Sequence, residues 1–407
     1  MVPEGWTSVP LSTLFEFKNG LGADAKSYGS GVKFVNVMDV FSGASLTEDC
    51  IIGSVQVSSR QVDNYALQYG DVLFNRTSET PEEIAYATVY LDNKPAVFGS
   101  FVIRARPVDD RLEPNFCKYV FQPAYVRKQL ISRCQGAIRA NIGQADLRKV
   151  KMLLPPKSEQ GKISEILSTW DRAIEVTECL IANNQSKKSA LAQQLLSGRV
   201  RLAQFKGLNW SHVALAQMGK VVTGGTPESS RSAYWGGEIN WATPSDITDN
   251  NQRFISTTER RITEAGLRAS AAKLLPAGSL LVCTRATVGV MSISTSPICT
   301  NQGFKNLIPN KHFDVEFLYY LFQFRKHDFV RYACGSTFLE ISKRDFEKLE
   351  FLVPSLKEQR AIREILSTCE SQIDEMRAFR KALLDEKLAL MQQLLIGKRR
   401  VNVEVVQ

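Results

Sequence analysis

The segment from Leu153 to Leu202 recurs between Leu352 and Val401 of this 407-residue chain. The two copies align at a constant offset of 199 positions, so that Glu159-Gln160 matches Glu358-Gln359. Each copy also contains Ile-Leu-Ser-Thr near its start and Gln-Gln-Leu-Leu near its end. An internal repeat of this length constrains the architecture more strongly than any single motif. We therefore expect two globular segments, each followed by a copy of the same long helix.

Both copies have the apolar spacing of a coiled-coil helix. Apolar residues recur at alternating intervals of four and three, the helix is expected to begin after a proline, and a glycine is the expected stop. About 38 residues would extend roughly 57 Å, which is long for a helix inside one globular core. The narrow seam favours two helices that pack on each other, antiparallel if the halves are related by a two-fold, over an ordinary hairpin in a larger core. The positions expected to form this spacer are Glu159, Gln160, Ile163, Leu167, Trp170, Ile174, Gln193, Leu195, Glu358, Gln359, Ile362, Leu366, Ile373, Gln392 and Leu394.

Polar residues interrupt both seams near their centres. They either set the register of the two helices or face a partner subunit. The residues in these slots include Thr177, Asn184, Lys188, Arg380 and Lys387.

The segments between the helices are rich in β-strand signals. Short runs of β-formers at 32–40, 71–74, 85–91 and 97–102 are separated by Gly, Asp and Ser clusters, and 115–134 has helical spacing. The second globular segment repeats this plan. The sequence thus predicts an α+β (mixed α/β) fold with two globular domains, two long helices in an antiparallel coiled coil, and a pseudo-two-fold internal repeat. The expected boundaries are 1–152, 153–202, 203–352 and 353–407.

Composition narrows the class of protein. Apolar residues make up 44% of the chain, enough for each segment to bury a core, and no run approaches the length of a membrane span. The cytoplasm is the expected location. The eight cysteines form no C-x-x-C pair and the three histidines are isolated, so no metal site is expected. No nucleotide-binding loop, nucleophile or cofactor motif is found, and a net charge of +9 suits nucleic acid.

Candidate DNA-contacting residues cluster in loops. The loop after the 71–74 run holds Arg76, and the loop in the same place in the second half holds Arg285, so the placement looks duplicated. Arginine can hold O6 and N7 of guanine together, and hydroxyls reach bases or phosphates. The alternatives are a surface salt bridge for each arginine and aromatic rings that pack beneath their own loop. The candidates are Arg76, Thr77, Ser78, Arg139, Asn141, Arg231, Tyr234, Trp235, Thr243, Ser245, Arg285, Thr287, Ser336 and Thr337.

With these motifs in place, the whole chain resembles the DNA-specificity subunits of type I restriction–modification systems. The resemblance rests on the duplicated layout, the P-x-x-x-E-Q helix openings, the Q-Q-L-L-x-G helix endings, and the T-G-G-T-P, Y-W-G-G and W-A-T-P-S-D motifs that begin at Thr223, Tyr234 and Trp241. The first half lacks the T-G-G-T-P and Y-W-G-G motifs. It therefore looks like a different subclass of target recognition domain, so the contacts of one half are no guide to those of the other.

The resemblance implies a subunit without catalytic activity or a cofactor of its own. Each recognition domain would read one part of a bipartite target in double-stranded DNA, and unlike halves imply an asymmetric target. The paired helices would set the unread gap and help dock two modification subunits, which carry S-adenosylmethionine and methylate adenine. A restriction subunit can join such a complex. The competing hypotheses are a stand-alone DNA-modifying enzyme and a coiled-coil adaptor that binds only protein.

Overall fold

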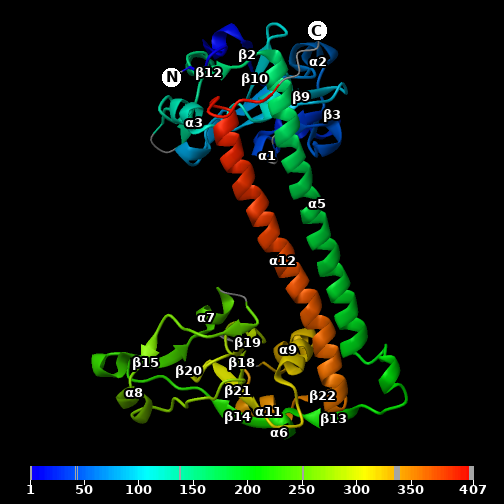
Figure 1. The fold of residues 1–407 in the computed structure, drawn as a ribbon, viewed down its shortest axis with the longest axis vertical. Coiled ribbons are helices and arrows are strands. Elements are labelled where there is room, and N and C mark those ends of the chain that lie inside the picture. The colour runs from blue at the N-terminus through cyan, green and yellow to red at the C-terminus, as the bar shows by residue number, and fades with distance from the viewer. Residues whose placement is uncertain are drawn as a thin grey trace. The chain divides into compact units, whose positions relative to one another are not determined.

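The computed structural model describes residues 2–41, 43, 45–136, 139–249, 252–333 and 340–402. The chain divides into two compact units (Figure 1). Unit 1 contains 1–178 and 378–407, and unit 2 contains 179–377. The boundary falls inside two long helices, α5 (Lys157–Leu196) and α12 (Leu356–Leu394). Each unit therefore combines one globular domain with half of each helix.

The globular domain of unit 1 is built on two main sheets. Among its described residues, the larger sheet has five strands in the order β2-β10-β6-β8-β4, and the smaller has three in the order β5-β3-β9. Two further strand pairs lie outside these sheets. They are β1-β12, which directly precedes the first long helix, and β11-β7. The elements are β1 (Thr7–Pro10), β2 (Phe15–Asn19), β3 (Tyr28–Val35), α1 (Val37–Phe41), β4 (Ser45–Leu46), β5 (Ser54–Val55), α2 (Ser59–Tyr65), β6 (Val72–Asn75), β7 (Thr77–Ser78), β8 (Ala87–Tyr90), β9 (Ala96–Phe98), β10 (Val102–Pro107), α3 (Ala124–Ile131), β11 (Ala140–Asn141), α4 (Gln144–Leu147) and β12 (Lys151–Leu154).

The globular domain of unit 2 repeats the strand order of the two main sheets and of the β1-β12 pair. Within the residues described, its sheets run β14-β21-β18-β19-β16 and β17-β15-β20, and β13 pairs with β22. In place of β11-β7 it has a single bridge between Arg285 and Glu340. The elements are β13 (Ser211–Ala214), α6 (Leu215–Met218), β14 (Gly219–Thr223), β15 (Trp235–Ala242), α7 (Pro244–Thr248), β16 (Phe254–Ile255), β17 (Arg261–Ile262), α8 (Glu264–Arg268), β18 (Leu280–Cys283), β19 (Met291–Ser294), β20 (Ile298–Thr300), β21 (Phe304–Pro309), α9 (Val315–Phe324), α10 (Lys326–Tyr332), α11 (Lys343–Lys348) and β22 (Glu350–Val353).

The predicted mixed α/β fold with an internal repeat is confirmed, and three local predictions are corrected. The strand expected over 32–40 ends at Val35, because the Asn36 N–H donates to Asp39 Oδ2 at 2.7 Å and the chain enters α1. The run 97–102 contains a turn between β9 and β10. The helix expected over 115–134 is interrupted at Pro123, because a proline ring does not fit in the interior of a helix. Regular helix, α3, begins only after this residue.

The apolar ends of the long helices are anchored in the domain cores. In unit 1, Ile163 and Leu167 of α5 pack in one core with Leu394 of α12. In unit 2, Leu195 of α5 packs in the core with Ile362 and Leu366 of α12. Each globular domain thus holds the start of one helix and the end of the other. Gly198 and Gly397 end the helices with φ of 71° and 68°, as the sequence predicted.

Ion pairs join the polar slots of the two helices and show their antiparallel course within each unit. In unit 1, Arg380 Nη2 lies 2.6 Å from Glu178 Oε1, and Lys387 pairs with Asp171. In unit 2, Lys188 Nζ lies 2.6 Å from Glu370 Oε1. The Lys188–Glu370 pair is the repeat counterpart of the Lys387–Asp171 pair. The two lysines lie 199 positions apart, and so do the two acidic residues. These contacts support the register-setting role of the charged slots over exposure to a partner.

Candidate nucleic-acid interface

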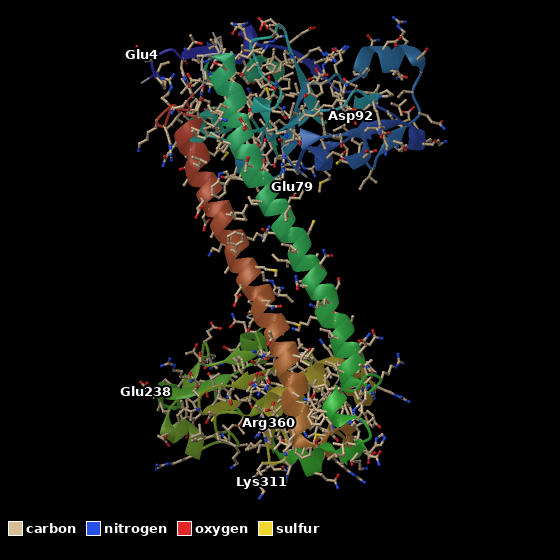
Figure 2. All side chains as sticks on the ribbon, turned by 45° about the vertical axis from the view of Figure 1, so that its right-hand side comes forward. Glu4, Glu79, Asp92, Glu238, Lys311 and Arg360 are labelled. Atoms are coloured by element: carbon tan, nitrogen blue, oxygen red, sulfur yellow. The ribbon has the colours of Figure 1, made fainter. Side chains whose placement is uncertain are left out.

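The residues predicted to contact DNA in unit 1 lie together. β7 pairs with β11, which places Thr77 opposite Asn141 and Ser78 opposite Ala140. Arg139, just before β11, is exposed, and its carbonyl accepts a hydrogen bond from Asn141 Nδ2 at 3.0 Å. Two loops far apart in sequence therefore present one polar surface. Figure 2 marks this region by Glu79, which follows β7.

Arg76 and Ser78 play different parts in that surface. The Arg76 backbone is fixed, because its N–H donates to Phe101 O at 2.8 Å and its carbonyl accepts from Ile142 N at 3.0 Å. Its half-buried side chain makes no ion pair with a residue that the structure describes. Ser78 is buried and donates to Glu83 Oε2 at 3.2 Å. The serine thus holds the loop, while the arginine remains available to a ligand.

Arg285 does not occupy the place of Arg76, which corrects the sequence-based equivalence. The backbone contacts of Arg76 recur at Thr284, whose N–H donates to Gly303 O at 2.8 Å and whose carbonyl accepts from Ile341 N at 3.0 Å. Arg285 therefore matches Thr77. Successive residues of an extended chain point to opposite sides, so the two arginines project differently.

The remaining candidates of that loop have distinct positions. Arg285 is exposed, and Thr287, whose N–H donates to Arg285 O at 2.8 Å, is half-buried. Ser336 and Thr337 lie outside the residues that the structure describes.

The hydroxyl candidates of unit 2 cap the short helix α7. Thr243 donates through its backbone N–H (2.7 Å) and its Oγ1 (2.6 Å) to Asp246 Oδ2, and it lies 2.8 Å from the exposed Ser245 Oγ. The start of α7 adjoins the Arg285 loop, since a Cβ placed on Gly303 would lie within 4 Å of both Pro244 and Arg285. The structure thus brings together two candidate loops that are separate in sequence.

The aromatic candidates of unit 2 pack beneath their loops. Trp235 donates from Nε1 to Glu228 O at 3.1 Å, and its ring meets Trp241 edge-on with centroids 4.9 Å apart. The Tyr234 ring lies under the exposed Arg231, 4.9 Å from the guanidinium carbon. The contacts fit the alternative in which these rings support the surface.

Arg260 is a residue that the sequence reasoning missed. Its guanidinium carbon lies 3.7 Å from the centroid of Trp235 and 5.2 Å from that of Trp241. Its carbonyl accepts from Trp241 N at 3.2 Å, which fixes the backbone beneath the stacked side chain. The only sequence signal was an arginine in a polar loop. Strand pairing brings this arginine to the two rings, and the spacing of residues along the sequence does not predict that pairing.

The corresponding place in unit 1 is Gly53. Its carbonyl accepts from Phe34 N at 2.9 Å, as Arg260 does from Trp241. The Phe34 ring meets Tyr28 edge-on at 5.2 Å, in the manner of the tryptophan pair. With no side chain at Gly53, a pocket of about 450 Å³ remains, and the exposed side chains of Ile52 and Phe101 line it.

The Glu-Gln motifs that open the long helices are buried in duplicated junctions. Gln160 Oε1 accepts from Glu113 N at 2.9 Å, and its Nε2 donates to the carbonyls of Arg111 and Pro155. Gln359 repeats the three bonds with Asp314, His312 and Pro354. The glutamines therefore fix the angle at which each helix leaves its domain.

The glutamates of these motifs bind an arginine from the end of the other helix. Arg400 contacts both oxygens of Glu159, and the Trp6 Nε1 donates to the same carboxylate. Arg201 makes a two-bond contact of 2.7 Å with Glu358. All four motif side chains are engaged inside their own unit, which suits a spacer role and leaves little of them for a partner.

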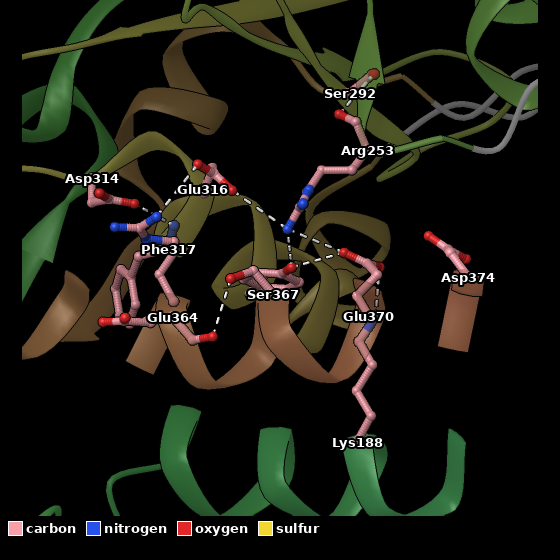
Figure 3. Close-up of polar contacts among 12 residues, drawn as sticks. Lys188, Arg253, Ser292, Asp314, Glu316, Phe317, Glu364, Ser367, Glu370 and Asp374 are labelled. Atoms are coloured by element: carbon pink, nitrogen blue, oxygen red, sulfur yellow. Dashed lines mark hydrogen bonds and ion pairs between the residues drawn. The ribbon is translucent and has the colours of Figure 1, made fainter. Parts of the chain in front are cut away.

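A charged network ties unit 2 to its helix pair (Figure 3). Arg253 Nη1 lies 3.2 Å from Glu370 Oε2 and 3.4 Å from Glu316 Oε2, and Tyr320 donates to Glu370 at 2.8 Å. Burial acts to raise the pKa of Glu370, but bonds from Lys188 and Tyr320 and nearby positive charges outweigh it, so the pKa is lowered. Burial and the neighbouring Glu370 raise the pKa of Tyr320. The network therefore holds Glu370 ionised and Tyr320 neutral.

Several predicted docking positions on the helices are open to solvent. Gln193 and Gln392 are exposed, and Trp170 is half-buried. Trp170 borders a groove of about 630 Å³ in unit 1, which Ile166, Leu390 and Leu394 also line. The seam positions Ile174 and Ile373 are buried.

Comparison with known proteins decides the family. The family model described as the type I restriction modification DNA specificity domain matches residues 3–183 and 208–384. The chain belongs to this family. Over 98% of its length it is 25% identical to a putative type I restriction enzyme MjaX specificity subunit of Methanocaldococcus jannaschii, of which the match covers 95%. It is 34% identical to the MjaIX specificity subunit of that organism, but there the match covers 42% of the relative, less than half its length.

Solved structures of the family share the fold. The S subunit of a type I system from M. genitalium superposes with a TM-score of 0.57 over 96% of both chains at 16% identity. The HsdS subunit from Thermoanaerobacter tengcongensis gives 0.53 over 98% of both chains at 20% identity. Of the helices in the described ranges, none is long and apolar enough to cross a membrane. No group of three metal-binding side chains occurs among the described residues.

Proposed function

We propose that this chain is the DNA-reading subunit of a type I modification complex, without catalytic activity of its own. Each globular domain reads one part of a bipartite target in the major groove of double-stranded DNA. The observation that carries the proposal is a strand topology repeated throughout the described domains under unlike surfaces, as at Gly53 and Arg260. A duplicated framework suits two half-sites, and unlike surfaces suit an asymmetric target.

The paired helices set the length of unread DNA between the half-sites. α5 has 40 residues, which extend roughly 60 Å at 1.5 Å per residue. That length exceeds one turn of DNA, about 34 Å, as a spacer between separate half-sites requires. The interhelical ion pairs fix the register of the two helices within each unit.

The exposed faces of the helices dock two modification subunits, which carry S-adenosylmethionine and methylate adenine; a restriction subunit can join. Two copies of one partner need two like surfaces. Leu180 and Phe379 satisfy this requirement, since they are matched by the repeat and both are exposed. The groove beside Trp170 adds an apolar anchor on unit 1.

Insertion of one heptad into both helices tests the proposal. The natural places are between Glu178 and Cys179 and between Arg377 and Ala378, because each unit then keeps its own contacts. Seven residues add roughly 10 Å, which is about three base pairs. Mapping of methylated adenines in cells that carry the variant should return both half-sites unchanged, with a gap longer by about three base pairs.

The matched control inserts the heptad into α5 alone, which misaligns the ion pairs and should abolish methylation. An unchanged gap in the double insertion would refute the spacer role. Methylation by the purified chain alone would instead show an enzyme. Failure to bind DNA selectively with the modification subunit present would show a protein-binding adaptor.

A further inference from the structure

Arg260 lies over two aromatic rings, Trp235 and Trp241, whereas the exposed Arg231 lies over one, Tyr234. Its guanidinium carbon lies over the ring of Trp235, with Trp241 as a second ring, and its guanidinium makes no hydrogen bond or ion pair with any described side chain. The adjacent Arg261 is ordinary by comparison, since its Nη1 lies 3.8 Å from the exposed Glu238. A face-stacked guanidinium keeps its N–H groups free at its edge.

We propose that Arg260 reads a guanine in the half-site bound by unit 2, with Trp235 as its positioning residue. A guanidinium donates two parallel N–H bonds, and guanine presents O6 and N7 in the major groove as the matching acceptors. The two rings favour one position of the side chain before DNA arrives. Arg260 therefore loses less rotamer entropy on binding than an arginine without such contacts.

The position of Arg260 places it beside the other candidate DNA contacts. Glu259, its neighbour, donates its N–H to Asp246 Oδ1 at 2.8 Å, so the loop before β17 is fastened to α7. Ser245 and the Arg285 loop adjoin the same helix. The guanidinium thus belongs to the surface on which the proposed function already depends.

The comparison between the units argues against a purely structural role for Arg260. Unit 1 forms the same three-stranded sheet and the same edge-on aromatic pair with Gly53 at the equivalent position. The framework therefore does not need a guanidinium there. An exposed charge that the fold does not require, held over two aromatic rings and without an acidic partner among the described residues, is suited to a ligand with acceptor atoms.

The test uses the full chain assembled with its modification subunits, and it rests on the proposed function. Selection from random duplexes first defines the target of the wild-type complex. Each guanine in the target is then replaced in turn by 7-deazaguanine, which lacks the N7 acceptor. At one guanine, we expect 7-deazaguanine to weaken binding by the wild-type complex about tenfold. At the same position, it should weaken binding by the Arg260→Ala complex less than twofold.

Three variants separate base reading from other roles. Arg260→Lys should behave like Arg260→Ala in base preference, because an ammonium lacks the planar fork. Trp235→Leu should reduce the preference partly, and Arg261→Ala, the matched control, should leave it unchanged. Circular dichroism of each variant monitors the fold.

Defined outcomes overturn the inference. A target without guanine, or a 7-deazaguanine effect that persists in Arg260→Ala, contradicts it. If Arg260→Ala weakens random duplexes equally and Arg260→Lys restores them, the contact is to phosphate. If the wild-type complex selects no sequence at all, the proposed function fails together with the inference, whereas the other results leave that function intact.

Discussion

Gly53 in unit 1 and Arg260 in unit 2 occupy one place in the fold and give it opposite chemistry. Each carbonyl accepts a hydrogen bond from an aromatic residue of the central strand of its small sheet. In unit 2 the guanidinium covers the two rings, whereas in unit 1 the rings border an open pocket with Ile52, 92% exposed, at its rim. A backbone pattern is retained while one side chain changes the surface from apolar to cationic.

The helix junctions show the converse. At Gln160 and Gln359 both the side chain and its three hydrogen bonds are the same. The buried parts of the two units are thus constrained by the helix pair that they share, and the exposed faces are not. If this division holds, substitutions in the junction should affect stability, and substitutions on the faces should affect only the choice of DNA.

The largest effect is expected at the junction of unit 2. Glu358→Ala leaves the half-buried Arg201 without its carboxylate, and removal of one member of a buried ion pair costs about 3 kcal/mol. Urea unfolding of the full chain, followed by tryptophan fluorescence, should show the loss. Glu159→Ala should cost less, because Arg400 is more exposed than Arg201. Equal losses would mean that burial does not distinguish the two junctions.

The reading arginines should come next. Arg76→Ala and Arg285→Ala should each weaken binding at one half-site by about 1–3 kcal/mol, with no change in the free energy of unfolding. Competition binding of the complex to duplexes altered in one half-site at a time measures this separately for each variant. Loss at both half-sites and on random duplexes alike would identify phosphate contacts instead.

A smaller effect is expected at the open pocket of unit 1. Ile52→Ser and Phe101→Ala remove exposed apolar side chains, which are suited to contact with the methyl group of thymine. Replacing one thymine by deoxyuridine in the half-site of unit 1 should weaken wild-type binding about fourfold, from roughly 0.8 kcal/mol per buried carbon. Binding by the two variants should not change when thymine is replaced by deoxyuridine. Val108→Ser, at an exposed site outside the pocket, is the control. If binding by this control also became insensitive to the thymine methyl group, the result would argue against the pocket.

The smallest effect should be a pH dependence that arises from Glu370 in unit 2. The pKa of Glu370 is lowered in the folded state, so its contribution to stability is complete above the unfolded value of 4.5 and is lost as the pH falls below it. The difference in unfolding free energy between wild type and Glu370→Gln should therefore narrow from pH 6 to pH 3.5. A constant difference would show that the carboxylate charge contributes nothing.

The repeat made the helices and the fold class predictable, because heptad spacing and an offset of 199 positions are properties of sequence order. Local elements were less predictable. The end of β3 depends on one side chain, Asp39, that accepts a hydrogen bond from the Asn36 N–H, and the start of α3 depends on Pro123. Element boundaries of this kind follow from a single hydrogen bond or a single proline ring, and the average propensities of the residues do not reveal them.

The site was predictable in composition but not in geometry. The loops that hold Arg76 and Arg285 were identified, yet a shift of one residue separates their positions, and only strand register shows it. Arg260 escaped notice because its partners lie on the neighbouring strand β15. Contacts across a sheet depend on pairing, which linear spacing does not encode.

The ion pair between Arg400 and Glu159 spans 241 positions and closes unit 1 with a segment from the far end of the chain. Unit 2, in contrast, is continuous from Cys179 to Arg377. A ribosome releases the chain from its N-terminus, so every residue of unit 2 emerges before α12 can complete unit 1. The domain that is made first is therefore the one that finishes folding last. Until α12 has been made, the carboxylate of Glu159 lacks its ion-pair partner, Arg400.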